Sequence, residues 1–193
     1  MKIAMATACM LAGVAVAAAA AKSGPEAHWK VAVCVERVPG DPGNPAIENA
    51  GMMATTMFSR IGVNLEWHDS GACPSEAIRI SLSDATPKDL HPGALAYATP
   101  YGDAHIVVFR DRIRTNVRPQ VVPALTAHVV VHEITHILQG FSRHSSSGLM
   151  KAHWSPHDQE TMAVMPLPFT AEDIDLIRRG MAWREGLASA GVR

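Results

Sequence analysis

Three histidines and one glutamate lie close together in the segment HEITHILQGFSRH, residues 132–144. His132 and His136 are four residues apart, so on a helix their imidazoles lie on one face, one turn apart. Two such imidazoles can bind one zinc ion, and a catalytic zinc site keeps a coordination position open for water. Glu133 can accept a proton from that water. The H-E-x-x-H spacing therefore predicts a zinc site built for hydrolysis, with Glu133 as general base.

The surrounding sequence predicts that this motif lies on a buried helix. Residues 121–140 are mostly apolar, with Pro123 in the first turn and Gly140 just beyond the end. Imidazoles and a carboxylate are costly to bury without partners. A metal would satisfy them, and the alternative is a set of core histidines bonded to backbone carbonyls.

A zinc site needs at least one further protein ligand, and His144 is the first candidate. Gly140 lets the chain turn sharply after the helix, so that His144 can return to the metal. His128 shares a helix face with His132 and His136, but three such positions span about 12 Å, too far for one ion. Four further candidates follow His144 in the sequence: His153, His157, Asp158 and Glu160.

The motif resembles the active-site segment of the metzincins, a branch of the zincin metallopeptidases. The family consensus is H-E-x-x-H-x-x-G-x-x-H, followed by a methionine turn. His132, Glu133 and His136 match this consensus directly. Gly140 and His144 are the residue types that the consensus requires. The interval from His136 to Gly140 and the interval from Gly140 to His144 are each one residue longer than in the consensus. The likeness extends over roughly residues 93–180, and this region resembles small secreted bacterial metzincin-like proteins.

The resemblance implies a zinc-dependent peptidase that acts on peptide or protein substrates. Met150, in the segment SSGLMKA, is the candidate methionine-turn residue that would lie beneath the metal. Zincin folds also place an edge strand beside the cleft, where it pairs with an extended peptide. Residues 104–112, just before the site helix, are expected to form that strand. The tyrosine that many metzincins carry after the methionine turn is missing, because Tyr97 and Tyr101 both precede the helix.

The order of the remaining segments predicts an α+β domain. The resemblance implies that this domain is of zincin type, with a twisted mixed sheet packed on the site helix. Alternating or short apolar runs predict strands at residues 29–38, 63–69, 77–84, 94–99 and 104–110. Apolar residues at helical spacing predict a first helix from Ile47 to Ile61. Residues 142–168 have no period and predict a loop. Residues 169–185 predict a closing helix, with Thr170 as its cap and Glu172 and Asp173 in its first turn.

The N-terminal residues predict export. One lysine, a run of small apolar residues and a stretch of alanines form a signal peptide over residues 1–21, followed by one domain over residues 22–193. The alternative is an uncleaved membrane anchor. After cleavage we expect a secreted or periplasmic protein without a stable membrane span. Two cysteines would remain, Cys34 and Cys73, and they are expected to form a disulfide. A formal net charge of −1 gives no electrostatic basis for binding nucleic acid.

A second function remains open at this point. A non-catalytic zinc-binding module would hold the metal with four protein ligands and leave no position for water. His153 or Asp158 could complete such a closed site. A third possibility is that the likeness to metzincins is only local and the chain binds a partner through its edge strand.

Overall fold

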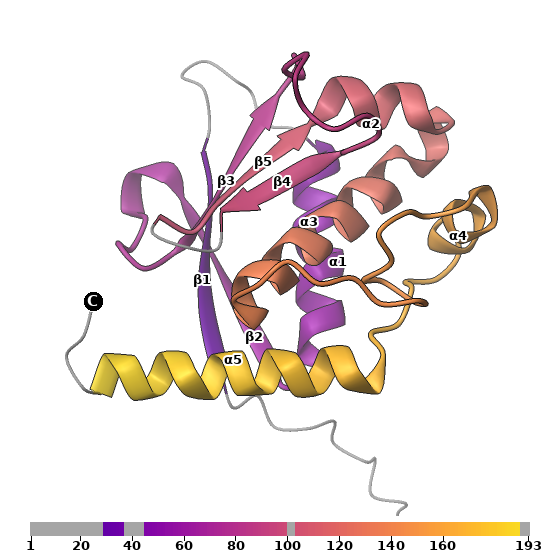
Figure 1. The fold of residues 1–193 in the computed structure, drawn as a ribbon. Coiled ribbons are helices and arrows are strands. Elements are labelled where there is room, and N and C mark those ends of the chain that lie inside the picture. The colour runs from indigo at the N-terminus through magenta and orange to yellow at the C-terminus, as the bar shows by residue number, and fades with distance from the viewer. Residues whose placement is uncertain (1–28, 37–44, 100–102, 190–193) are drawn as a thin grey trace, which may run out of the picture.

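The computed structural model describes residues 29–36, 45–99 and 103–189 (Figure 1). The predicted signal peptide, the end of the first predicted strand and Tyr101 lie outside these ranges. Within these ranges, twelve elements follow one another: β1 (Trp29–Val35), α1 (Pro45–Ser59), β2 (Val63–Asp69), η1 (Ser70–Ala72), β3 (Ile78–Ser83), β4 (Ala96–Thr99), β5 (His105–Phe109), α2 (Arg110–Asn116), η2 (Pro119–Val121), α3 (Val122–Gln139), α4 (Pro156–Met162) and α5 (Ala171–Ser189).

The five strands form one mixed sheet in the order β2-β1-β3-β5-β4. Neighbouring strands are parallel except at the end of the sheet, where β4 pairs antiparallel with β5. The expectation that residues 104–112 form the edge strand is wrong, because β5 pairs with β3 on one side and with β4 on the other. The hairpin folds the earlier strand, β4, onto the outer side of β5, so β4 becomes the edge. From residue 110 the segment turns into α2.

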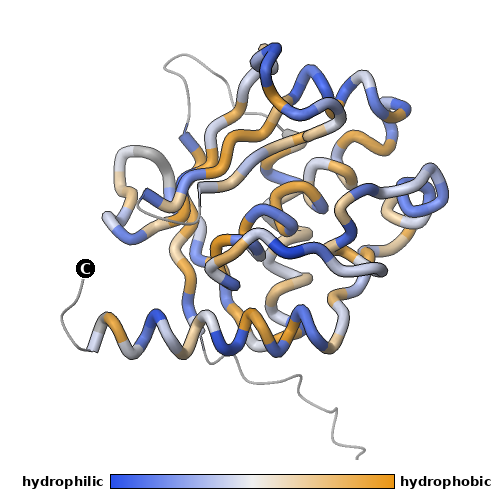
Figure 2. Tube along the Cα trace, viewed as in Figure 1, coloured by the Kyte–Doolittle hydropathy of each residue, from blue (hydrophilic) through white to orange (hydrophobic). Residues whose placement is uncertain are grey.

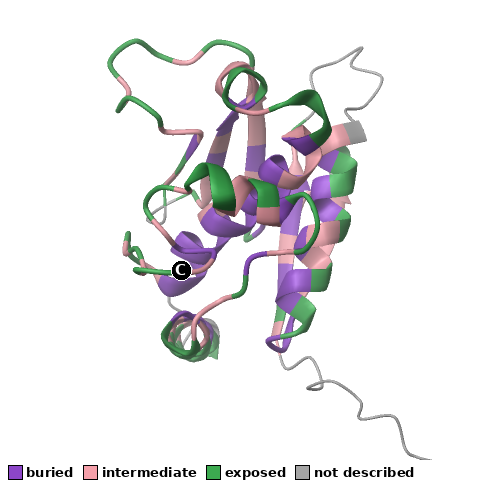
Figure 3. Cartoon of the chain, turned by 90° about the vertical axis from the view of Figure 1, so that its right-hand side faces the viewer, coloured by how far each residue is buried: buried purple, intermediate pink, exposed green. Residues whose placement is uncertain are grey.

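Helices α1 and α3 pack against each other and against one face of the sheet (Figure 1). Inward-facing strand residues such as Val33, Ile80 and Ile106 are fully buried beneath them. Hydrophobic residues gather on the strands and on the helices that contact them (Figure 2), and the same segments contain most of the buried residues (Figure 3). The predicted α+β architecture is therefore confirmed.

Helix α3 is the central helix of this core. With η2 it is long and apolar enough to cross a membrane by length and composition, but most of it is buried inside the fold. All its residues from Leu125 to Gln139 are buried except Glu133, which is half-buried. The two histidines of the motif are thus carried on a helix that is buried along most of its length.

Two short helices, α2 and α4, were not predicted from the sequence. Helix α2 is mostly charged and buries a single residue, Ile113, so it has no helical apolar period to detect. Helix α4 lies in the segment expected to be a loop. It begins with a capping box in which the Ser155 hydroxyl accepts the Asp158 N–H and Asp158 accepts the Ser155 N–H. This Ser-Pro-x-Asp signal was present in the sequence.

Helix α5 crosses the C-terminal end of α3 in close contact. A Cβ atom at Gly180 would lie 1.9 Å from the Leu138 carbonyl oxygen, so only glycine fits there. Four residues later, the Arg184 guanidinium donates a hydrogen bond of 2.5 Å to the Ile137 carbonyl. The same carbonyl also accepts the Gly140 N–H at 3.2 Å, so Arg184 is a second donor to it at the end of α3, where i to i+4 partners are missing.

We expect Gly180→Ala to lower the free energy of unfolding by about 3 kcal/mol, because the added methyl group must push two backbones apart. Gly186→Ala is the matched control: it lies on the same helix and its Cβ would meet nothing within 4 Å. That variant should be neutral or more stable by up to about 1 kcal/mol. Urea denaturation measures both changes. Equal stability of the two variants would contradict the close crossing.

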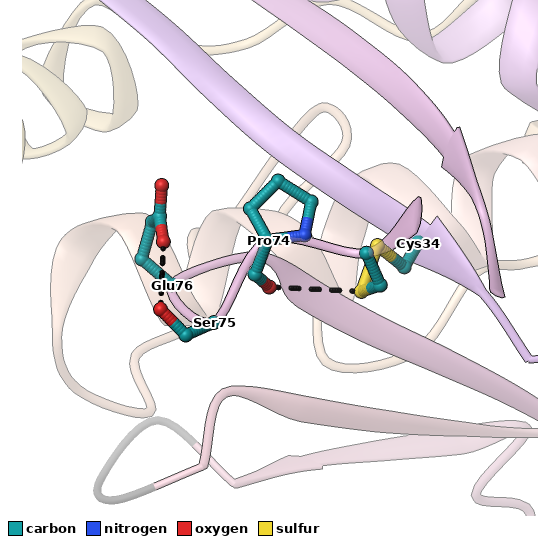
Figure 4. Close-up of a disulfide and its surroundings, with 5 residues drawn as sticks. Cys34, Pro74, Ser75 and Glu76 are labelled. Carbon is teal, nitrogen blue, oxygen red and sulfur yellow. Dashed lines mark hydrogen bonds between the residues drawn. A yellow bond between two sulfur atoms is a disulfide. The ribbon is translucent and has the colours of Figure 1, made fainter. Parts of the chain in front are cut away.

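The predicted disulfide between Cys34 and Cys73 is present and links residues 39 positions apart (Figure 4). Cys34 lies near the end of β1 and is buried, whereas Cys73 lies in the segment between β2 and β3. The bond therefore ties the connection between two strands to the strand that lies between them in the sheet.

Candidate metal centre

Helix α3 and the turn after it bring three histidines together. The Nε2 atoms of His132 and His136 lie 3.0 Å apart, on one face of the helix. Gly140 ends the helix in the left-handed conformation, with φ 80°, as the sequence predicted. The chain then reverses, and the His144 ring lies 5.3 Å from that of His132 and 5.1 Å from that of His136. One nitrogen of each ring lies within 4.8 Å of the others, so one ion could contact all three.

The donor atoms fit a zinc ion. His132 Nδ1 lies 3.2 Å from the Leu149 carbonyl, and donation to it leaves Nε2 as the nitrogen with a free lone pair. Two nitrogens bonded tetrahedrally to one zinc ion lie about 3.3 Å apart. The separation of the His132 and His136 Nε2 atoms is close to this value. Three imidazoles are also a ligand set that zinc uses in catalytic sites.

The surroundings of all three rings favour the neutral form of imidazole. Burial lowers the pKa of His132 to about 3, with a further contribution from neighbouring His136. Burial and then His144 lower the pKa of His136 to about 4. The pKa of His144 is also lowered, by burial and then by His153. Neutral imidazole is the form that binds metal ions, so the cluster is ready for a cation without losing protons first.

Glu133 lies beside this cluster on the wall of an open cleft of about 630 Å³. Burial raises the pKa of its carboxyl to about 7. A carboxyl with a pKa near the working pH can both accept and donate a proton. The cleft is also lined by the edge strand β4, including Tyr97, and by residues 151–154 after the predicted methionine turn.

The loop after His144, residues 145–154, is held by hydrogen bonds that were not predicted from the sequence. The Leu149 carbonyl accepts from Trp154 Nε1, at 3.2 Å, as well as from His132. The Trp154 ring also meets the His132 ring edge-on at 5.5 Å. Met150 is fully buried, and its carbonyl accepts the Ser145 N–H at 2.7 Å. The predicted methionine-turn residue thus lies on the loop that contacts His132 and the residue after His144.

One solved structure that is similar to this chain in fold is that of archaemetzincin from Methanopyrus kandleri, at a TM-score of 0.52. The match covers 81% of this chain and 97% of that chain. The chain has an archaemetzincin-like fold. The two sequences are 15% identical, a level at which the likeness establishes the fold alone. No protein-family model and no curated protein matches the chain in sequence.

In this archaemetzincin-like fold His128 is not placed to bind the same ion. Its Nδ1 lies 2.7 Å from the Ala124 carbonyl, and its Nε2 accepts the Leu167 N–H at 3.0 Å. Both ring nitrogens are therefore used in holding the backbone. Burial lowers the pKa of His128, in keeping with a neutral structural histidine. The expectation that one ion cannot reach His128 together with His132 and His136 agrees with this geometry.

The downstream candidates also lie outside the cluster, which is the one such group among residues 29–36, 45–99 and 103–189. Asp158 accepts hydrogen bonds from Lys151 Nζ and from Ser155, and the Lys151 contact is the main reason that its pKa falls to about 2. His157 and Glu160 are exposed on α4. His153 lines the cleft close enough to His144 to lower its pKa.

Proposed function

We propose that the protein is an exported zinc-dependent metallopeptidase. The observation that carries the proposal is the cluster of His132, His136 and His144, with their nitrogens within 4.8 Å of one another. The archaemetzincin-like fold supports the same conclusion. Glu133 and the open cleft beside the cluster favour catalysis over storage of the metal.

The residues around the cluster suggest how hydrolysis would proceed. Zinc, when bound by the three histidines, supplies a Lewis acid that polarises a carbonyl and makes water acidic near neutral pH. Glu133 accepts a proton from the attacking water and then donates it to the leaving amine. Its raised pKa, about 7, suits both steps. The Leu149 carbonyl keeps the His132 ring in its metal-binding tautomer throughout.

The edge strand supports a peptide as substrate. Strand β4 ends the sheet and lines the cleft, so its outer backbone groups are available to an extended chain. A peptide bound in this way adds one strand to the sheet and is recognised mainly through its backbone. We therefore propose peptide or protein substrates of varied sequence.

A non-catalytic zinc-binding module is the second candidate, and the position of His153 is the observation that favours it. His153 lies near His144 and could close the coordination shell. Asp158 is less suited to that role, because its carboxylate is already bonded to Lys151 and Ser155. Glu133 has no function in a closed site, so its position favours the peptidase.

Export is supported by the disulfide between Cys34 and Cys73, because such bonds persist in oxidising compartments. Together with the signal peptide proposed for residues 1–21, it favours a secreted or periplasmic protein that carries one peptidase domain over residues 22–193.

Metal removal tests the proposed function. We expect gently purified protein to contain stoichiometric zinc and to hydrolyse members of a mixed peptide library. Dialysis against a chelator should abolish hydrolysis, and added zinc should restore it, because the three histidines hold the metal at the reacting carbonyl. The control is the same chelator saturated with zinc beforehand. Hydrolysis that survives complete metal removal would contradict the proposal.

A further inference from the structure

The third histidine of the cluster lies on a much less regular element than the other two. His132 and His136 are fixed by a buried helix, whereas His144 lies on a loop and is exposed. Ordering the backbone of one loop residue costs about 1–2 kcal/mol. A side chain that must meet two others at one ion therefore needs neighbours that hold its backbone in place.

The residues on either side of His144 supply these contacts, and both bind the first turn of α5. The Ser145 hydroxyl donates a hydrogen bond of 2.5 Å to Asp173 Oδ1. Arg143 Nη2 lies 2.5 Å from Glu172 Oε2, and Arg143 Nη1 lies 3.8 Å from Asp173 Oδ1. The segment that carries His144 is thus tied to one helix end from both sides.

Asp173 also caps helix α5, but this role involves only one of its two carboxylate oxygens. Its Oδ2 accepts the Thr170 N–H at 2.9 Å, and its own N–H donates to the Thr170 hydroxyl at 3.1 Å. This reciprocal pair is a capping box for α5. A cap needs one oxygen and is normally exposed, yet Asp173 is completely buried. The other oxygen, Oδ1, points to Ser145 and Arg143, which compensate the buried charge.

We propose that Asp173 is a positioning residue for the metal centre, which holds His144 in place through Ser145. The inference rests on the proposed role of the three histidines. A second anchor acts in the same direction, because the Ser145 N–H donates to the Met150 carbonyl.

Three variants separate positioning of His144 from simple stabilisation of α5. Ser145→Ala removes the contact with the loop and leaves the helix cap intact. Asp173→Asn removes the charge as well. Thr170→Ala is the matched control, because it weakens the cap by about 1 kcal/mol and leaves the loop contact in place. Zinc affinity is measured by competition with a chromophoric chelator, and the site is monitored by the visible absorption of bound Co²⁺.

We expect Ser145→Ala and Asp173→Asn to bind zinc about 10- to 100-fold more weakly than wild type and to change the Co²⁺ spectrum. Thr170→Ala should lower the melting temperature with zinc affinity unchanged. Wild-type zinc affinity in folded Ser145→Ala would overturn the inference, as would an equal loss in all three variants. These measurements need no turnover, so a wild type that binds zinc but cuts no peptide would contradict the proposed function alone.

Discussion

Glu133→Gln is expected to reduce peptide hydrolysis about a thousandfold while the protein keeps its zinc. The amide has nearly the same shape as the carboxyl but cannot accept the proton of the attacking water. The three histidines are untouched, so metal binding should remain. The measurement compares kcat/KM on a cleaved peptide with the zinc content of the same preparation.

Glu160→Gln is the matched control for this experiment. It makes the same chemical change on the exposed surface of α4, away from the cluster. We expect full activity and full zinc content in that variant. Undiminished hydrolysis by the Glu133→Gln variant would show that Glu133 is not the general base. If the wild type itself binds zinc and cuts nothing in the peptide library, the non-catalytic module becomes the better description.

Loss of the disulfide is expected to lower the free energy of unfolding by about 4 kcal/mol. The bond closes a loop of 39 residues, and it stabilises mainly by restricting the unfolded chain. This amount is a large share of the roughly 5–15 kcal/mol that stabilises an ordinary domain. Urea denaturation with and without reductant measures the change.

The double variant Cys34→Ala/Cys73→Ala completes this test. It should unfold at the lower urea concentration of the reduced wild type, and reductant should have no further effect on it. If the urea denaturation midpoint of the wild type is the same with and without reductant, the disulfide adds nothing to stability.

The sequence predicted the parts of the site that are local along the chain. His132 and His136 share a helix face because of their spacing alone, and Gly140 predicted the turn that ends the helix. His144 was the first of several candidates to join them, because a chain that reverses after Gly140 can return to the same face. Thr170 likewise predicted the start of α5, where it forms the expected cap.

Features that depend on contacts between distant segments could not be read in the same way. The edge strand was misplaced because strand order depends on which side of β5 accepts the hairpin partner, and no residue type encodes that choice. The Leu149 carbonyl that orients His132 is a backbone atom, so it has no sequence signature. The contact between Ser145 and Asp173 joins residues 28 positions apart, each of which suits an ordinary loop or helix cap.

The dependence of His144 on α5 has a consequence for biosynthesis. A ribosome makes Asp173 28 residues after Ser145, so a nascent chain carries all three histidines before the helix that anchors the third. We therefore expect the proposed zinc centre to assemble only after α5 has been made and has docked on α3. Under the proposed export, a chain that crosses the membrane before α5 has docked would hold the proposed centre in an incomplete form.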